Sequence, residues 1–359
     1  MIQEAIAKVT QGLDLSELES TQIMTRIINC KVSPAQAGAL LVGLKIKGET
    51  VDEILGAARA FRAHGDPIPL KGPKVALDRD EINMDRETIA DTCGTGGKGT
   101  RTFNVSTTTA FVVAGAGLKV AKHGLRSSSG RCGSADVVEA LGVDLSLTPG
   151  QVGACIDRIG IGFLYGPGLR SMMSHVLTIR REMGIRTILN LMGPLTNPAK
   201  ANVQVLGVYD PALTETMALV LDRLGCRSAF VVHGQDGNDE ISITGPSRIT
   251  RLKEGLVSTE TLVPEDVGLK TASPERIIGG DPARNARITR AVLSGDPGPC
   301  RDMVLLNAAA VLTAAGKTET LQEGVLAAAE AIDSGQALEK LNLLVAMGLG
   351  SSARAHALG

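Results

Sequence analysis

The sequence predicts an α/β protein, with a mainly parallel central sheet flanked by helices and a smaller all-helical domain. Two observations carry this prediction. Three helix start signals fall within the first 65 residues. From Thr88 onward, short apolar runs alternate with helical stretches, which is the rhythm of βαβ units around a parallel sheet. The 359-residue chain also exceeds the roughly 250–300 residues that one hydrophobic core supports, so two domains are expected.

The helical domain is expected over residues 1–68, followed by a linker or hinge over residues 69–87. A Ser or Thr three residues before a Glu has the spacing of a capping box, and Pro favours the first helical position. The linker carries prolines, glycines and mixed charges without a repeating apolar face. Three start signals each precede a helical apolar pattern: Ser16 with Glu19, Ser33 with Pro34, and Thr50 with Glu53.

The α/β domain is expected over residues 88–359. Short apolar runs predict its strands, and longer segments with apolar residues every three or four positions predict its helices. The expected strands are residues 88–93, 118–124, 203–210 and 228–234. The expected helices are residues 105–117, 134–142 and 211–225, with two more within residues 303–335.

Composition indicates an ordinary globular protein, with 43% hydrophobic and 21% charged residues. A formal net charge of −1 provides no overall field that would attract DNA or an anionic membrane. With no Trp, two Tyr and five Phe, the chain has few rings on which unpaired bases could stack. We therefore expect a small-molecule partner and no nucleic acid.

Cysteine spacing and the N-terminal residues indicate a cytoplasmic protein. The six cysteines form no CxxC pair and no Cys/His cluster, so neither a zinc site nor a disulfide framework is expected. The first residues lack the basic and apolar regions of a signal peptide, and no apolar run approaches a membrane span of about 18 residues. We expect neither export nor anchoring in a membrane.

The segment CGTGGKGT, residues 93–100, follows a predicted strand. Its glycines, Gly94, Gly96 and Gly99, allow a sharp turn and present bare N–H groups to an anion, although a lone glycine cluster is as often a simple tight turn. The spacing formally matches the dinucleotide fingerprint, but the acidic residue expected about 20 positions later is missing. A P-loop is excluded because Lys98 precedes glycine rather than Ser or Thr. A different phosphate ligand remains.

The chain around this glycine loop is basic, which favours phosphate binding over a simple turn. Between Thr92 and Ala135 no Asp or Glu occurs. Such a segment is suited to meet negative charge. Six basic residues fall within the same stretch: Lys98, Arg101, Lys119, Lys122, Arg126 and Arg131.

Two further segments would lie beside the glycine loop. Asn104, Ser106 and Thr107 open the next helix, where hydroxyls and free N–H groups can bind phosphate or a metal-bound oxygen; ordinary N-capping is the alternative. Residues 122–130 form a second basic turn after the next strand, at the carboxyl edge of the expected parallel sheet. The two loops would then share one crevice for a polyanion.

An adjacent carboxylate pair, Asp239 and Glu240, follows the strand predicted to end near His233. Adjacent acids in a turn are usually just solvated. Beside a polyphosphate, however, such a pair suits Mg²⁺, which takes one or two carboxylates together with phosphates and water. The pair complements the two basic loops, and we expect magnesium there.

Ordered segments along nearly the whole chain carry a family resemblance: LKIKGETVDEILGAARAFR, GTGGKGTRTFNVSTTTAFVVAGAGLKVAKHG, GSADVVEALGV, RREMGIRTILNLMGPLTNPA, VVHGQDGNDEISITGP, LLNAAAVL and EAIDSG. In this order they resemble the anthranilate phosphoribosyltransferases, enzymes of tryptophan biosynthesis that join anthranilate to phosphoribosyl pyrophosphate. The resemblance implies the nucleoside phosphorylase/phosphoribosyltransferase-like fold. It also implies a helical domain completed by about residues 168–185, an active site in the cleft between the domains, and a homodimer formed through the helical domain.

Site residues follow from the resemblance, position by position. Those matching the donor site are Gly94, Gly97, Lys98, Thr102, Asn104, Val105, Ser106, Thr107, Lys122, His123, Gly124, Arg126, Ser129, Gly130 and Ser134. Those matching the acceptor site are Gly94, Leu125, Arg170 and Arg180. Those matching the magnesium site are Ser106, Asp239 and Glu240.

Three positions depart from the family pattern. Leu125 stands where the family usually has an Asn that contacts anthranilate, and Arg170 stands where it usually has a His. Lys98 replaces an Asp in the glycine loop, which reverses the charge there. A buried hydrogen bond discriminates between substrates by orders of magnitude, so the acceptor side is the part of the site most open to change.

The function implied is transfer of the phosphoribosyl group to the amine of anthranilate with release of pyrophosphate. Such a reaction develops positive charge on the sugar and negative charge on the leaving group, which favours electrostatic over covalent catalysis. Three alternatives stay open: a phosphoribosyltransferase for another aromatic acceptor, a nucleoside phosphorylase, and a non-catalytic relative that binds nucleic acid. A phosphorylase would leave the carboxylate pair without a purpose, and a nucleic-acid binder would need a broad basic face.

Overall fold

The computed structural model describes residues 1–70, 87–97, 102–126, 132–165 and 167–356. Its N-terminal helices begin where the start signals predicted. Ser16 with Glu19 and Thr50 with Glu53 form complete capping boxes, and Ser33 forms one with Gln36. The four helices are α1 (Ile2–Thr10), α2 (Glu17–Ile28), α3 (Pro34–Lys47) and α4 (Val51–Ala63).

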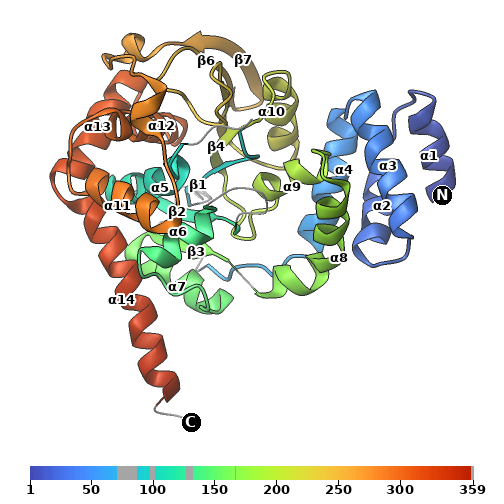
Figure 1. Ribbon diagram of the computed structural model, residues 1–359, viewed down its shortest axis with the longest axis horizontal. Helices are drawn as coiled ribbons and strands as arrows, with labels where there is room; N and C mark the ends of the chain where they lie inside the picture. Colours follow the sequence, from blue (N-terminus) through green and yellow to red (C-terminus); the bar gives the residue numbers. More distant parts are fainter. Residues whose placement is uncertain (71–86, 98–101, 127–131, 166, 357–359) are drawn as a thin grey trace, which may run out of the picture.

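A later helix joins this N-terminal bundle. α8 (Pro167–Met183) packs against α2 and α3, and α4 contacts α9 (Leu189–Leu195) and α10 (Leu213–Arg223). Figure 1 shows α1 to α4 and α8 together at one end of the molecule, with the sheet and the remaining helices at the other.

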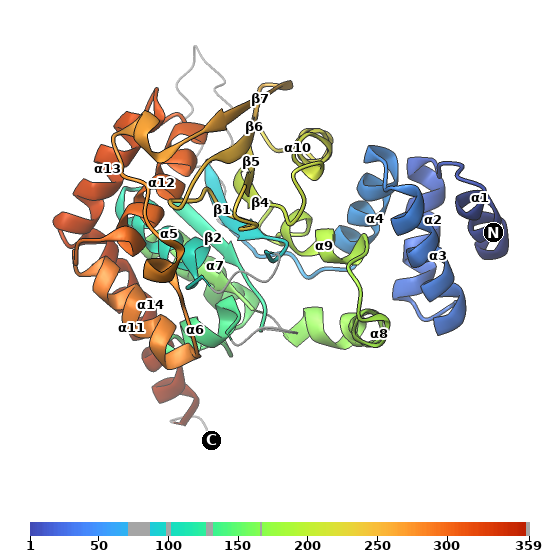
Figure 2. The ribbon, with the colours of Figure 1, turned by 45° about the horizontal axis from the view of Figure 1, so that its top comes forward.

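The central sheet has seven strands in the order β3-β2-β1-β4-β5-β6-β7. The first five are parallel, which confirms the mainly parallel sheet, and β6 and β7 extend it as an antiparallel hairpin. Figure 2 shows these strands crossing the body of the molecule. The strands are β1 (Ile89–Gly94), β2 (Lys119–His123), β3 (Ile161–Leu164), β4 (Val203–Gly207), β5 (Ser228–Gly234), β6 (Ser247–Lys253) and β7 (Leu256–Leu262).

Helices cover both faces of the sheet, and strand residues alternate between two apolar cores. Phe230 and Val232 of β5 belong to the core under α5, α12 and α14, whereas Ala229 and Val231 belong to the core under α9 and α10. This second core continues without a break into the helical bundle. The remaining helices are α5 (Val105–Gly115), α6 (Ser134–Ala140), α7 (Pro149–Ile159), α11 (Pro282–Leu293), α12 (Pro299–Ala314), α13 (Leu321–Asp333) and α14 (Gln336–His356).

The chain reverses direction within the sheet next to β1. From β1 it moves to β2 and β3 on one side, then returns to β4 on the other side of β1. In open α/β sheets, ligands bind at such a switch point, outside the carboxyl ends of the strands. β1 ends at Gly94 and β4 ends at Gly207, and these two residues are directly paired.

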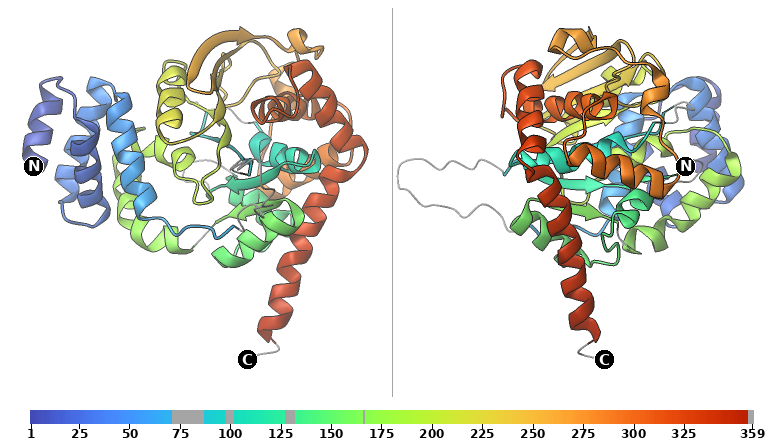
Figure 3. Two further views of the ribbon diagram at one scale, coloured as in Figure 1. Left: turned by 180° about the vertical axis from the view of Figure 1, so that it is seen from behind. Right: turned by 60° about the vertical axis from the view of Figure 1, so that its left-hand side comes forward.

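The C-terminal helix α14 extends beyond the body of the molecule, as both views in Figure 3 show. Its first half is anchored, because Ala337, Leu341 and Leu344 are fully buried. Within the described residues, no helix combines the length and apolar character needed to cross a bilayer.

Candidate active site

Two paired glycines make room for a carboxylate at the switch point. A Cβ atom on Gly94 would lie 2.1 Å from Oδ2 of Asp239, and a Cβ atom on Gly207 would lie 1.6 Å from its backbone oxygen. No side chain can be placed at either strand end without moving Asp239. The glycines at the carboxyl ends of β1 and β4 thus admit the acidic segment between the strands.

Asp239 and Glu240 reach two different backbone segments from this position. Oδ2 of Asp239 accepts a 2.7 Å hydrogen bond from the N–H of Gly96, and Oε1 of Glu240 accepts a 3.1 Å bond from the N–H of Ser106. Burial, reinforced by the neighbouring Asp239 charge, raises the pKa of Glu240 to about 8. Burial also raises the pKa of Asp239, against the hydrogen bonds from the glycine loop.

This pair suits magnesium by its chemistry. Two carboxylates beside the Ser106 hydroxyl provide the hard oxygen ligands that Mg²⁺ prefers, and a divalent cation would offset both the burial and the mutual repulsion that raise the pKa of Glu240. Among the described residues, no group of three or more His, Cys, Asp or Glu side chains could hold a metal alone. A cation here would therefore complete its coordination with oxygen atoms of water or of a substrate, as magnesium at phosphate sites does.

The N-terminus of α5 faces the carboxylates. Val105 and Thr107 are buried in the first turn of the helix, and between them the backbone N–H of Ser106 donates to Glu240. The capping alternative is wrong for Asn104, whose side chain makes no capping hydrogen bond. Thr102 pairs with Ile278 in an isolated bridge that continues this wall of the site.

The second basic turn begins in buried surroundings. Lys122 is 3% exposed, and its ammonium donates a 2.9 Å hydrogen bond to the backbone oxygen of His123. Burial lowers the pKa of His123, and its Nδ1 lies 3.0 Å from the backbone oxygen of Gly193. Buried Asp91 accepts the N–H of His123 at 3.2 Å, which ties this turn to β1.

The next residues of this turn pack against α6. A Cβ atom on Gly124 would lie 2.2 Å from Oγ of Ser134, so this glycine is required for close approach. The Ser134 hydroxyl accepts the N–H of Leu125 at 3.1 Å and donates to its carbonyl at 3.3 Å. The Leu125 side chain itself is 45% exposed.

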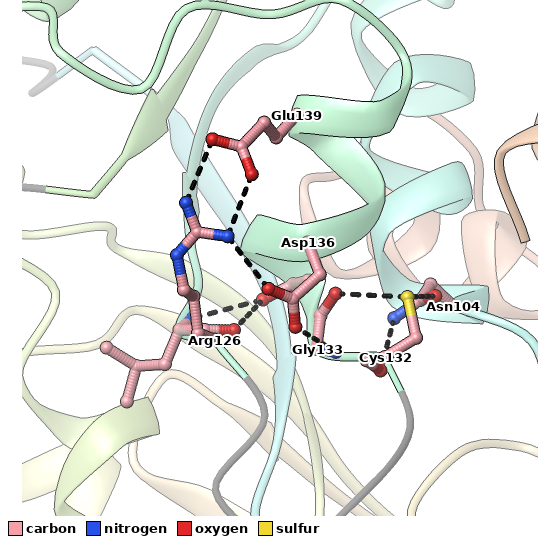
Figure 4. Close-up of polar contacts among 8 residues, drawn as sticks. Asn104, Arg126, Cys132, Gly133, Asp136 and Glu139 are labelled. Atoms are coloured by element: carbon pink, nitrogen blue, oxygen red, sulfur yellow. Dashed lines mark hydrogen bonds and ion pairs between the residues drawn. The ribbon is translucent and has the colours of Figure 1, made fainter. Parts of the chain in front are cut away.

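Arg126 is bound by two carboxylates of α6. Its guanidinium makes a forked contact with Glu139, at 2.8 and 2.9 Å, and a third contact with Asp136 at 3.0 Å (Figure 4). The same figure shows Gly133 donating its N–H to Asp136. The assignment of Arg126 to the donor site stays a prediction. Any anion that binds Arg126 would compete with Glu139 and Asp136.

The prediction that the whole basic stretch meets a ligand is wrong for Lys119. This lysine begins β2, at the opposite edge of the sheet from the carboxylates. Its ammonium pairs with Glu87 at 2.6 Å and Asp157 at 3.3 Å. The absence of acids close in sequence did not prevent acids from elsewhere in the chain from neutralising it.

The predicted acceptor residues come from three places: Gly94 ends β1, Leu125 follows β2, and the two arginines, Arg170 and Arg180, lie on α8. Arg180 is partly buried, and burial together with the neighbouring charge of Arg186 lowers its pKa. Lys98, Ser129 and Gly130 lie outside the described residues.

Two polar residues of the site escaped the sequence analysis. Arg186 contacts the backbone oxygens of Gly96 and Gly97. Asn285, on α11, donates a 2.8 Å hydrogen bond to Oδ1 of Asn104 and accepts the N–H of Gly280 at 2.7 Å. Arg186 lies in RREMGIRTILNLMGPLTNPA, one of the segments that carry the family resemblance, and this position was the signal that could have identified it. Nothing local marked Asn285, which is 181 residues from its partner.

Comparisons with known proteins agree with this geometry. The model of the glycosyl transferase family α/β domain matches residues 86–338, and that of the family's helical bundle domain matches residues 3–65. An anthranilate phosphoribosyltransferase of Syntrophotalea carbinolica is 53% identical over 350 residues, which cover 97% of this chain and 99% of that protein.

Solved structures show the same likeness. Anthranilate phosphoribosyltransferase from Thermus thermophilus matches with a TM-score of 0.86 and 42% identity, over 96% of this chain and 98% of that one. The enzyme from Saccharomyces cerevisiae in complex with PRPP (phosphoribosyl pyrophosphate) and Mg matches with a TM-score of 0.84 and 28% identity, over 97% and 98%.

Proposed function

This chain belongs to the anthranilate phosphoribosyltransferase family, and on that premise we propose that it transfers the phosphoribosyl group of phosphoribosyl pyrophosphate to the amine of anthranilate, releasing pyrophosphate. One observation in the fold supports this most directly. The Asp239–Glu240 pair lies at the switch point of the sheet, between two glycine-ended strands and the N-terminus of α5.

We infer that the donor's pyrophosphate lies between the glycine loop and the N-terminus of α5. Backbone N–H groups at both places provide fixed dipoles for an anion, which need no rearrangement as negative charge grows on the leaving group. Asp239, Glu240 and Ser106 would hold magnesium, which when bound neutralises negative charge on the leaving pyrophosphate. The neutral amine of the acceptor is already nucleophilic, so the chain's main task is to position both substrates.

The remaining donor residues surround this centre in our proposal. Lys122 and His123 lie at the end of β2, and Gly124 follows them. Ser134 is the first residue of α6, and its hydroxyl accepts the N–H of Leu125. Asn104 and Thr102 lead into α5. All these residues come from segments that meet at the carboxyl edge of the sheet.

The acceptor would bind between Arg180 and Leu125, where Arg180 pairs with the carboxylate of anthranilate. A partly buried guanidinium suits a planar carboxylate, because its fork of donors matches both oxygens. The side chain of Leu125 can make only apolar contacts with the acceptor. A related aromatic acceptor is therefore the second candidate.

Pyrophosphate release tests the proposal. Purified protein with MgCl₂ and phosphoribosyl pyrophosphate should release pyrophosphate with anthranilate, and a panel of other aromatic amines and acids should give slower release. Release with another acceptor but none with anthranilate would reassign the acceptor. Release with none of them would contradict a transferase.

Removing the carboxylate charges tests the site. Asp239→Asn combined with Glu240→Gln should abolish magnesium-dependent turnover and leave the thermal unfolding transition cooperative. A matched control, Glu265→Gln with Asp266→Asn, neutralises another adjacent acidic pair that is exposed and remote from the sheet's switch point. Undiminished turnover in the first variant would exclude the assigned metal ligands.

We further propose a cytoplasmic homodimer that contacts its second copy through the helical domain, formed by residues 1–68 and completed by about residues 168–185. Leu13, Leu18 and Ile46 expose 51%, 66% and 82% of their surface on this bundle, where a second copy would cover them. Sedimentation at micromolar concentration should show a dimer that Ile46→Glu weakens. With its near-neutral charge, the protein should not shift DNA or RNA in a gel at physiological salt.

A further inference from the structure

Arg186 lies between α8 and α9 and extends to the glycine loop. Its Nη1 donates to the backbone oxygen of Gly96, and its Nη2 donates to that of Gly97 at 2.7 Å. Two consecutive carbonyls thus bind one planar guanidinium. Because the guanidinium presents its donors in a rigid fork, this contact fixes the orientation of both peptide groups.

N–H groups of the same loop face the carboxylate of Asp239. A trans peptide places its N–H opposite its C=O, so turning the Gly96 carbonyl toward Arg186 turns the Gly97 N–H away from it. The N–H of Gly96 donates to Oδ2 of Asp239 at 2.7 Å, and the N–H of Gly97 lies on the same side of the loop and favours the charged form of this carboxylate. The loop therefore has a carbonyl side, held by Arg186, and an N–H side, which faces Asp239.

This division matters for an anionic ligand. Carbonyl oxygens repel phosphate, whereas N–H groups bind it. A glycine loop adopts many conformations, and only some of them present N–H groups alone. An arginine that binds both carbonyls selects those conformations and compensates the partial charge of the carbonyls.

The guanidinium is itself held in place. It stacks 4.7 Å from the centre of the Tyr209 ring, and Lys45 of α3 lies 5.5 Å from the same ring centre. Tyr209 also donates its N–H to Oγ1 of Thr95 at 2.9 Å, so the ring that holds Arg186 is attached to the loop that Arg186 orients. Through Lys45 the helical bundle contacts this assembly.

We propose that Arg186 is a positioning residue of the donor site, which orients the glycine loop by binding the Gly96 and Gly97 carbonyls so that its N–H groups face Asp239 and the donor's pyrophosphate. The proposal rests on the proposed function. The two arginines then have different roles: Arg180 binds the acceptor, and Arg186 orients the glycine loop that binds the donor.

The test compares Arg186→Lys and Arg186→Gln with wild type and with Arg181→Gln, an exposed arginine of α8. Calorimetric titration with phosphoribosyl pyrophosphate and MgCl₂, without acceptor, measures donor binding. Hydrogen exchange of the ligand-free proteins measures the protection of the loop N–H groups. Steady-state rates then give separate KM values for donor and acceptor.

We expect Arg186→Gln to weaken donor binding by about 10- to 100-fold, the range for losing a hydrogen bond to a charged group. Arg186→Lys should give a smaller loss, because the charge stays but the fork is absent. Both should speed exchange at Gly96 and Gly97 and leave the KM for anthranilate unchanged. Arg181→Gln should behave as wild type in every measurement.

Wild-type donor affinity and loop protection in both Arg186 variants would overturn the inference, as would an effect confined to the KM for anthranilate. If Arg186→Gln does not fold, the Arg186→Lys results decide. The proposed function fails separately, when wild type itself neither binds the donor nor releases pyrophosphate. Loop exchange is measured without ligands and still reports on Arg186 in that case.

Discussion

Gly94→Ala adds one methyl group at the point where β1 meets the acidic segment. The Cβ atom would lie 2.1 Å from Oδ2 of Asp239 and 2.9 Å from its Cγ. Gly94 does not adopt a positive φ, so alanine strains nothing but this contact. Real Cβ atoms do not approach other atoms closer than 3.0 Å, and the carboxylate must therefore retreat by about 1 Å.

A displacement of this size acts on function more than on folding. The 2.7 Å hydrogen bond from Gly96 to Asp239 would be lost, and the carboxylate would leave the position from which it serves a metal. Misplacing a reacting group by about 1 Å costs on the order of 100-fold in rate. Moving one side chain that is partly open to solvent should destabilise the fold by only about 1–3 kcal/mol.

Steady-state pyrophosphate release and thermal unfolding measure the two effects together. We expect kcat/KM for the donor to fall about 100-fold with a cooperative unfolding transition retained. Gly150→Ala is the matched control, since Gly150 is exposed in the first turn of α7, and a Cβ there meets no atom within 4 Å. A Gly94→Ala enzyme with wild-type kcat/KM would refute the view that the glycine exists to admit Asp239.

Three other changes test other parts of the structure. Asn285→Ala should raise the donor KM about 5- to 10-fold, because Oδ1 of Asn104 loses the hydrogen bond that Asn285 donates; an unchanged KM would exclude a role for this contact. Leu125→Asn should lower the KM for anthranilate about 5- to 10-fold by restoring an amide to the acceptor side, and a higher KM would contradict this. The hydrogen bond from Lys8 lowers the pKa of Glu19 to about 2 from the ordinary glutamate value of 4.5. The stability that ionised Glu19 contributes is therefore complete above pH 4.5 and is lost as the pH falls toward 2. Glu19→Gln should therefore lower the melting temperature more at about pH 7 than at about pH 3.5, and the reverse order would contradict the assignment.

Local signals were sufficient for most helices and for four of the five parallel strands, whereas β3 was not predicted. Capping boxes act between residues three apart, so Ser16 with Glu19 and Thr50 with Glu53 mark helix starts wherever the helix later packs. The β6–β7 hairpin escaped prediction. Its turn places Glu254 and Gly255 at φ values of 51° and 79°, where Asn or Asp is the usual first residue.

Charge partners could not be predicted in the same way. The stretch from Thr92 to Ala135 is free of acids, yet Lys119 pairs with Asp157 and Arg126 pairs with Glu139. Ion pairs form between side chains that the fold brings within a few ångströms, and sequence separation does not limit them. A local excess of one charge therefore predicts a polyanion site only where no distant partner arrives.

The sequence by itself determined the helix starts, the glycine loop, the adjacent acids and the family resemblance, because each of these depends on residues close together in the chain or on their order. The tertiary structure alone decided that Asp239 lies between Gly94 and Gly207, that Arg186 binds the carbonyls of the glycine loop, and that Asn285 supports Asn104. These contacts join residues from 32 (Gly207 and Asp239) to 181 (Asn104 and Asn285) positions apart. Their partners are selected by strand order and by the space that glycines leave, and neither is encoded in local spacing.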